Sequence, residues 1–249
     1  MVNFLVDVGN TDTCAGIAQD YKIVADTRAV SSVPADVFLS GGPKFIPDRA
    51  IISSVVAEKT QEWTWAIRRR WGIDAIVLTS DRVSGILNFD VEDPNKVGAD
   101  RIADAVGAVL EYKAPCIVAD FGTATNIEYV DENKTFCGGV IATGLWSGMK
   151  SLAQFASALS DVRLEVPKQV VGRSTETAVQ SGLVYGEAAR IDGLVAMIKA
   201  QANKDIVDDI KVVATGGYSR LVGPLCSSVD FIDSLLTLKG LNFILNHID

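Results

Sequence analysis

Two loops of similar sequence constrain the fold of this chain more than any other feature. The first reads Asp7-Val-Gly-Asn-Thr11 and the second reads Asp120-Phe-Gly-Thr-Ala-Thr125; we call them the Asp7 loop and the Asp120 loop. Each follows a short apolar, β-rich run and is followed by two further strand-like runs joined by a polar turn. The chain therefore predicts two related halves, although the repeated segment is too short to prove a duplication.

The remaining pattern predicts a mixed α/β protein. A helix over 58–71, with Trp63, Ile67 and Trp71 on one face, lies between predicted strands and predicts a βαβ unit with parallel strands. Further helices are expected over 99–112, 148–159, 176–200 and 236–246. Strands are expected over 2–8, 14–18, 22–28, 50–56, 75–79, 116–121, 126–130, 135–141 and 211–214. Residues 30–48 predict a loop with at most a short helix. We place the domain limits at 1–114 and 115–249.

Composition narrows the class of protein. Of the 249 residues, 48% are apolar and 22% charged, so the chain has enough apolar surface for a sizeable core. The net charge of -8 argues against binding nucleic acid or anionic lipid through bulk charge. It leaves open a phosphate site built locally from backbone N–H groups and a metal ion.

The N-terminal sequence and the spacing of the cysteines favour a cytoplasmic protein. The first residues lack the basic start and apolar core of a signal peptide, and no run of about 18 apolar residues occurs, so no membrane span is expected. The four cysteines form no Cys-x-x-Cys pair, so neither a disulfide nor a zinc site is expected. Cys14 and Cys116 stand among apolar residues and are interpreted as small hydrophobes.

The Asp7 loop has the residue types of a phosphate site. Gly9 allows a ligand to approach the backbone, Asn10 and Thr11 add polar donors, and Asp7 suits Mg²⁺ held through water. The same residue types also favour an ordinary hairpin turn, and that alternative stays open for one loop alone. The Asp120 loop repeats the pattern with Gly122, and two such loops favour phosphoryl transfer, which depends on positioning and charge neutralisation.

Two further segments are candidates for binding a substrate or a nucleoside. Gly98-Ala-Asp-Arg101 opens a predicted helix, whose N-terminus favours an anion. There Arg101 suits a carboxylate and Asp100 suits the proton of an attacking hydroxyl; the alternative is an Asp–Arg surface pair at a helix cap. Thr215-Gly-Gly217 follows a strand and leaves room for a nucleoside, which is a weak signal alone.

The sequence argues against several common catalytic and nucleotide-binding motifs. The single histidine, His247, makes Ser-His-Asp and Cys-His catalysis improbable. Residues 144–151 approach a Walker A motif, but the spacing before Lys150 is wrong. No Gly-x-Gly-x-x-Gly segment follows a strand, so a dinucleotide fold has no support.

Taken together, the motifs resemble those of the type III pantothenate kinases of bacterial coenzyme A synthesis. The resemblance extends over nearly the whole chain, and the order and spacing of the motifs are more specific than any single one. The matching segments are 7–11, 53–56, 98–101, 120–125, 138–141, 180–182, 185–186, 214–217 and 236–241.

The resemblance implies an actin-like ATPase fold, with two ribonuclease-H-like domains and a nucleotide cleft between them, in a homodimer. It implies a kinase that uses ATP and Mg²⁺ to phosphorylate pantothenate. The implied ATP contacts are Asp7, Val8, Gly9, Asn10, Thr11, Asp12, Thr13, Cys14 and Thr123. The implied pantothenate contacts are Val91, Gly98, Ala99, Asp100, Arg101 and Thr175. Asp100 is the implied proton acceptor, and Asp120 the implied ligand of a monovalent cation, potassium or ammonium.

The chain departs from the family pattern on the acceptor side. Val91 stands where the family has Tyr, Thr143 where it has Pro, and Trp146 where an Arg is expected. Both ATP loops match. Two alternatives therefore stay beside pantothenate kinase: a nucleotide-binding, inactive paralogue with an accessory or regulatory role, and a kinase of another small alcohol.

Overall fold

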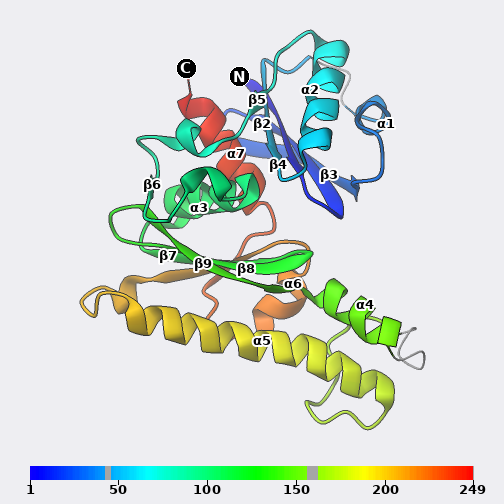
Figure 1. The fold of residues 1–249 in the computed structure, drawn as a ribbon, viewed down its shortest axis with the longest axis vertical. Helices are drawn as coiled ribbons and strands as arrows, with labels where there is room; N and C mark the ends of the chain where they lie inside the picture. Colours follow the sequence, from blue (N-terminus) through cyan, green and yellow to red (C-terminus); the bar gives the residue numbers. More distant parts are fainter. Residues whose placement is uncertain (43–45, 156–161, 249) are drawn as a thin grey trace. The chain divides into compact units, whose positions relative to one another are not determined.

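The computed structural model describes residues 1–42, 46–155 and 162–248 (Figure 1). The residues group into two compact units. The first unit comprises Met1–Tyr112, Lys134–Phe136 and Leu235–Asp249, and the second comprises Lys113–Asn133 and Cys137–Ser234. Among the helices described, none combines the length and apolar character needed to cross a bilayer.

A five-stranded sheet in the order β3-β2-β1-β4-β5 forms the centre of the first unit. Its strands are β1 (Val2–Val8), β2 (Asp12–Gln19), β3 (Lys22–Val30), β4 (Arg49–Ser54) and β5 (Ile76–Val77). The helices of this unit are α1 (Ala35–Ser40), α2 (Ala57–Trp71), α3 (Ala99–Tyr112) and α7 (Leu236–His247). β1 pairs antiparallel with β2 and parallel with β4, and β4 pairs parallel with β5, which confirms the predicted βαβ unit.

Alternation along β1 assigns its residues to two faces. Phe4, Val6 and Val8 belong to a core that includes Trp63 and Ile67 of α2. The intervening residues project to the opposite face, where the buried Asn3 side chain donates a hydrogen bond to Asn242 of α7 over 2.9 Å. Asp7 is the last residue of this second set, at the carboxyl end of the strand.

Close contact between α3 and α7 depends on two glycines. A Cβ on Gly107 would lie 2.7 Å from the Leu236 carbonyl oxygen, and a Cβ on Gly240 would overlap the Ala103 carbonyl oxygen. The helix backbones therefore approach more closely than alanine would allow. The C-terminal helix is thereby packed into the unit that begins the chain.

The second unit has the same strand arrangement. β9-β8-β7-β10-β11 repeats the order of the first sheet, with β7 (Cys116–Phe121) in the position of β1. The other strands are β8 (Ala124–Val130), β9 (Thr135–Thr143), β10 (Lys211–Thr215) and β11 (Phe231–Ile232). β6 (Asn88–Phe89) of the first unit pairs with Thr135 and Phe136, the part of β9 that belongs to that unit. The repeated arrangement confirms the two related halves predicted from the loops.

Helix α5 (Thr175–Gln201) packs against one face of the second sheet. In Figure 1 it lies, in yellow, along one face of β7, β8 and β9, beside α6 (Ser219–Val222). Ile117, Ala119 and Phe121 of β7 pack against Val184 and Ile191 of α5.

The alternate residues of β7, Val118 and Asp120, therefore lie on the face away from α5. Asp120 thus occupies in β7 the place that Asp7 occupies in β1.

Some predicted elements differ in extent. The helix predicted over 148–159 begins earlier, as α4 (Leu145–Phe155), and its residues 156–159 lie outside the described part of the chain. The strand predicted over 75–79 has only two residues, in β5. The two-residue strands β6 and β11 were not predicted, because so few residues leave no alternation to detect.

Candidate active site

The Asp7 loop connects β1 to β2 and is held by its own backbone and by Ser31. Gly9 N–H donates to the Asp12 carbonyl over 3.0 Å, which closes the turn. The Ser31 hydroxyl donates to the Gly9 carbonyl over 2.7 Å and lies 3.0 Å from the Thr13 hydroxyl. Ser31 therefore holds both sides of the loop.

The side chains of the predicted ATP loop differ in accessibility. Val8 and Thr13 are buried, so only their backbone atoms are available to a ligand. Asn10 is exposed, and Asp7, Thr11, Asp12 and Cys14 are partly buried. Burial raises the pKa of the Cys14 thiol, which keeps that thiol protonated and unreactive at neutral pH.

Asp7 is oriented by a residue to which the sequence analysis gave no role. Ser53 of β4 pairs with Asp7 in the parallel register, and its hydroxyl donates to Asp7 Oδ1 over 2.7 Å. Ser53 is fully buried. The signal that could have found it is the βαβ unit, because parallel pairing of the two strands brings their carboxyl ends to the same edge.

Gly98, Ala99, Asp100 and Arg101 lie together at the start of α3, in the first unit. The carboxylate of Asp100 folds back over Gly98, where a Cβ would overlap Asp100 Oδ1, and Oδ1 accepts a hydrogen bond from the Arg101 backbone N–H over 2.8 Å. Burial raises the pKa of the Asp100 carboxyl above its usual range, against the opposing effects of that hydrogen bond and of the Arg101 charge. A carboxylate with a raised pKa is a stronger base than an exposed one.

Arg101 is held by an aromatic pair that the sequence analysis did not identify. Its guanidinium carbon lies 5.4 Å from the centroid of the Phe136 ring, and Phe89 lies 5.8 Å from the same ring. Guanidinium groups stack favourably on aromatic faces. Residues 134–136 lie far along the chain, so no local pattern connects them with Arg101. Val91, two residues after Phe89, is partly buried.

The Asp120 loop lies in the second unit and turns from β7 into β8. Gly122 N–H donates to the Ala124 carbonyl, two residues on, over 3.0 Å, whereas Gly9 N–H in the Asp7 loop donates to the carbonyl three residues on. Gly216 has a φ of +88°, and a Cβ there would overlap Asp120 Oδ1 and lie 2.7 Å from the Phe121 nitrogen. The weak Gly-Gly signal after β10 therefore has a structural cause: the Asp120 carboxylate occupies the space that a side chain would need.

Thr175, the remaining predicted substrate contact, is the first residue of α5 and is exposed. It lines a shallow cavity of about 590 Å³ together with Leu152, Val179 and Leu183. Thr175 belongs to the second unit, whereas Gly98 to Arg101 belong to the first.

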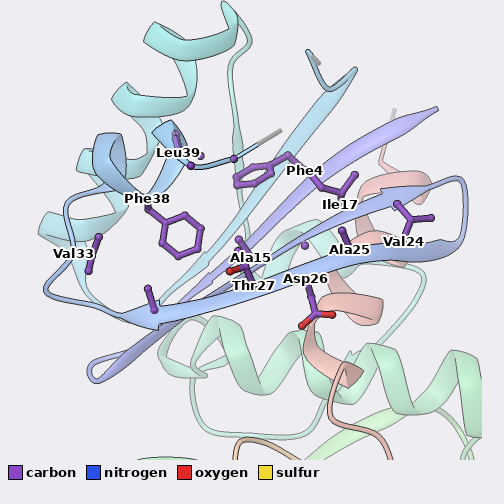
Figure 2. A pocket seen from close by; sticks show the side chains of 14 residues that line it. Phe4, Ala15, Ile17, Val24, Ala25, Asp26, Thr27, Val33, Phe38 and Leu39 are labelled. Atoms are coloured by element: carbon purple, nitrogen blue, oxygen red, sulfur yellow. The ribbon is translucent and has the colours of Figure 1, made fainter. Parts of the chain in front are cut away.

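A second cavity, in the first unit, contains none of the predicted site residues. It has a volume of about 590 Å³ and lies between α1 and the strands β1, β2 and β3 (Figure 2). Phe4, Phe38 and Leu39 project into it, while the carboxylate of Asp26 points away from Phe38. This apolar lining offers few donors for a phosphate, so this cavity is not a candidate phosphate site.

Comparison with solved structures defines the class of protein. A putative Baf family transcriptional activator from Campylobacter jejuni matches with a TM-score of 0.61 at 18% identity, over 98% of this chain and 97% of that one. A ROK family glucokinase from Streptomyces griseus, solved with glucose and AMPPNP, matches with a TM-score of 0.50 at 13% identity, over 100% and 99%. The chain has the actin-like ATPase fold, with two mixed α/β sheets, as the sequence predicted.

The sequence comparisons then define the family. The family model described as type III pantothenate kinase matches residues 3–197. A type III pantothenate kinase from Halalkalibacterium halodurans is 38% identical over 96% of this chain and 97% of that protein. The chain belongs to the type III pantothenate kinase family, ATP-using phosphotransferases of coenzyme A biosynthesis, which confirms the resemblance identified from the motifs.

Proposed function

We propose that this chain phosphorylates pantothenate with Asp100 as the general base. The hydroxyl of pantothenate attacks the γ-phosphorus of ATP in line, Asp100 accepts the hydroxyl proton, and ADP leaves. The observation that carries the proposal is the Asp100 carboxylate at the start of α3, partly buried and with a raised pKa. Gly98, Ala99, Arg101, Val91 and Thr175 contact pantothenate in this proposal.

ATP contacts the loop from Asp7 to Cys14 and Thr123. Support comes from a feature that the two loops share: in each, an aspartate lies one residue before the end of a central strand, and the N–H of the following glycine closes a tight turn. Preorganised backbone groups of this kind stabilise charge without reorganising during the reaction.

The residues fit two cations. No cluster of three or more Asp, Glu, His or Cys side chains occurs in the described part of the chain, so a cation would rely on few protein ligands. Asp7, oriented by Ser53, suits Mg²⁺, which keeps several waters and needs one or two carboxylates. Bound there, Mg²⁺ would neutralise charge on the phosphates.

Asp120 suits potassium or ammonium. Thr215, its neighbour in the parallel register, has a fully buried hydroxyl with no hydrogen-bond partner among the described residues. A buried hydroxyl of this kind is normally satisfied, so an oxygen-binding cation beside the Asp120 carboxylate accounts for it. The proposal includes a homodimer in the cytoplasm, as the family resemblance implies.

The test measures ADP release by the purified protein with ATP, Mg²⁺ and potassium, with and without pantothenate. We expect pantothenate-dependent release, and a decrease in kcat of about 10²-fold or more in Asp100→Asn. Full turnover by Asp100→Asn would rule out its role as the base. Nucleotide binding without turnover would instead favour the inactive paralogue, and turnover restricted to another small alcohol would favour a different acceptor.

A further inference from the structure

The Asp120 loop is attached to the segment that joins β9 to α4. The Thr123 carbonyl accepts hydrogen bonds from the Ser147 hydroxyl over 2.8 Å and from Gly144 N–H over 3.3 Å. A Cβ on Gly144 would lie 2.5 Å from the Gly122 carbonyl oxygen. The conformation of the loop therefore depends on where the backbone at 143–144 lies.

Two charged residues one turn apart on α5, Glu187 and Arg190, contact the Asp120 loop and the end of β9, respectively. Glu187 Oε1 accepts a hydrogen bond from the Thr125 hydroxyl over 2.6 Å. Arg190 forms an ion pair with Glu187 and donates a hydrogen bond to the Thr143 carbonyl over 2.9 Å. The chain Thr125–Glu187–Arg190–Thr143 thus links the end of the Asp120 loop to the start of the segment that supports it.

Burial makes the Thr125–Glu187 end of this link costly to break. Glu187 is 6% exposed and Thr125 is 1% exposed, so neither group has bulk water as an alternative partner. An ion pair in such a place is weak evidence for stability, because desolvation offsets much of the attraction. Removing one partner, however, leaves a buried polar group or charge unpaired.

We propose that Glu187 and Arg190 are positioning residues that hold the Asp120 loop in its ATP-binding conformation. Glu187 fixes Thr125, two residues after the proposed ATP contact Thr123. Arg190 fixes the backbone that supports Thr123, and it pairs with the buried Glu187 carboxylate. The inference rests on the proposed role of the Asp120 loop in binding ATP.

The test compares Glu187→Gln, Arg190→Gln and Thr125→Val with the unchanged protein. The primary measurement is the Kd of AMPPNP with Mg²⁺ by titration calorimetry, which requires no turnover. We expect a rise of about 10-fold in this Kd and in the KM for ATP, with the KM for pantothenate changed less than about twofold. Thr125→Ser keeps the hydroxyl and should retain the affinity of the unchanged protein.

Asp192→Asn is the matched control. Asp192 is another acidic residue of α5, and its carboxylate accepts hydrogen bonds from the backbone and hydroxyl groups of Ser227 and Ser228. It has no contact with the Asp120 loop among those described, so its loss should lower Tm without changing the nucleotide Kd.

Two outcomes separate this inference from the proposed function. Unchanged AMPPNP affinity in both Glu187→Gln and Thr125→Val, with only a lower Tm, would overturn the positioning role. An unchanged protein that binds AMPPNP but shows no pantothenate turnover would overturn the proposed function alone. If Glu187→Gln does not fold, the comparison of Thr125→Val with Thr125→Ser decides the question.

Discussion

Ser53 donates a hydrogen bond from its hydroxyl to Asp7 Oδ1 over 2.7 Å, across the parallel pair of β4 and β1. The bond helps to orient the Asp7 carboxylate at the end of β1. Such supporting partners matter because a site residue held in one orientation loses less entropy when its ligand binds.

Ser53→Ala should weaken MgATP binding. Without the hydroxyl, Asp7 loses a buried donor, and we expect the KM for MgATP to rise about 5-fold. Steady-state kinetics at several Mg²⁺ concentrations measure the effect. Ser54→Ala is the control, because the Ser54 hydroxyl bonds only to Val56 in the described structure and should leave this KM unchanged. An equal effect of both variants would contradict the orienting role.

Asp100→Asn should stabilise the protein at neutral pH while it removes activity. Because burial raises the pKa of Asp100 in the folded state, the ionised carboxylate is less favourable there than in the unfolded chain. The contribution of this group to stability is fully present below its unfolded pKa and is lost as pH rises through the folded value. The amide avoids that loss and still accepts the Arg101 hydrogen bond.

Urea unfolding of both proteins between pH 4 and pH 8 measures this difference. The advantage of the variant should be largest near pH 7 to 8 and shrink toward pH 4, near the ordinary pKa of aspartate. A constant difference across the range would show that the desolvated charge of Asp100 is not its origin.

Gly216→Ala should remove activation by monovalent cations. The new methyl group would overlap Asp120 Oδ1 and displace the carboxylate, so potassium should no longer stimulate turnover. Gly72→Ala is the control, since Gly72 also has a positive φ, of +73°, but a Cβ there meets nothing within 4 Å. That control should cost about 1 kcal/mol of stability and keep the potassium response. Potassium titrations of both variants at saturating ATP decide the question.

Gly240→Ala should strongly destabilise the first unit. Its Cβ would overlap the Ala103 carbonyl, so α3 and α7 must separate, at a cost of about 3 kcal/mol or more. Gly193→Ala, in the interior of α5 with no atom within 4 Å of the added Cβ, should instead stabilise by about 0.5 to 1 kcal/mol. Denaturant unfolding of the two variants measures both effects. Similar losses in both would refute the close-packing explanation.

Much of the fold followed from local pattern. Apolar runs predicted the central strands β1, β4 and β7, and the period of Trp63, Ile67 and Trp71 predicted α2, in which these three side chains are buried as expected. The strands β6 and β11 were not predicted, because two residues are too few to show an alternating pattern of apolar and polar side chains.

The residues that support the site were harder to predict. Ser53, Phe136, Glu187 and Arg190 act on residues distant in sequence, and although Ser53 lies in the matching segment 53–56, no local sequence names the partner of any of them. Their roles depend on which strands pair and in which register, and a single sequence does not state that pairing.

The sequence by itself determined the Asp7 loop and the Asp120 loop, their order along the chain and the family to which the chain belongs, because these depend on residue types at fixed spacing. The tertiary structure decided what holds those loops. It placed α7 against β1 through Asn3 and Asn242, set Ser53 beside Asp7, and joined Thr125 to Thr143 through Glu187 and Arg190. The physical reason is that hydrogen bonds and close packing between distant segments are fixed by the register of strands and the approach of helices, which appear only when the chain is folded.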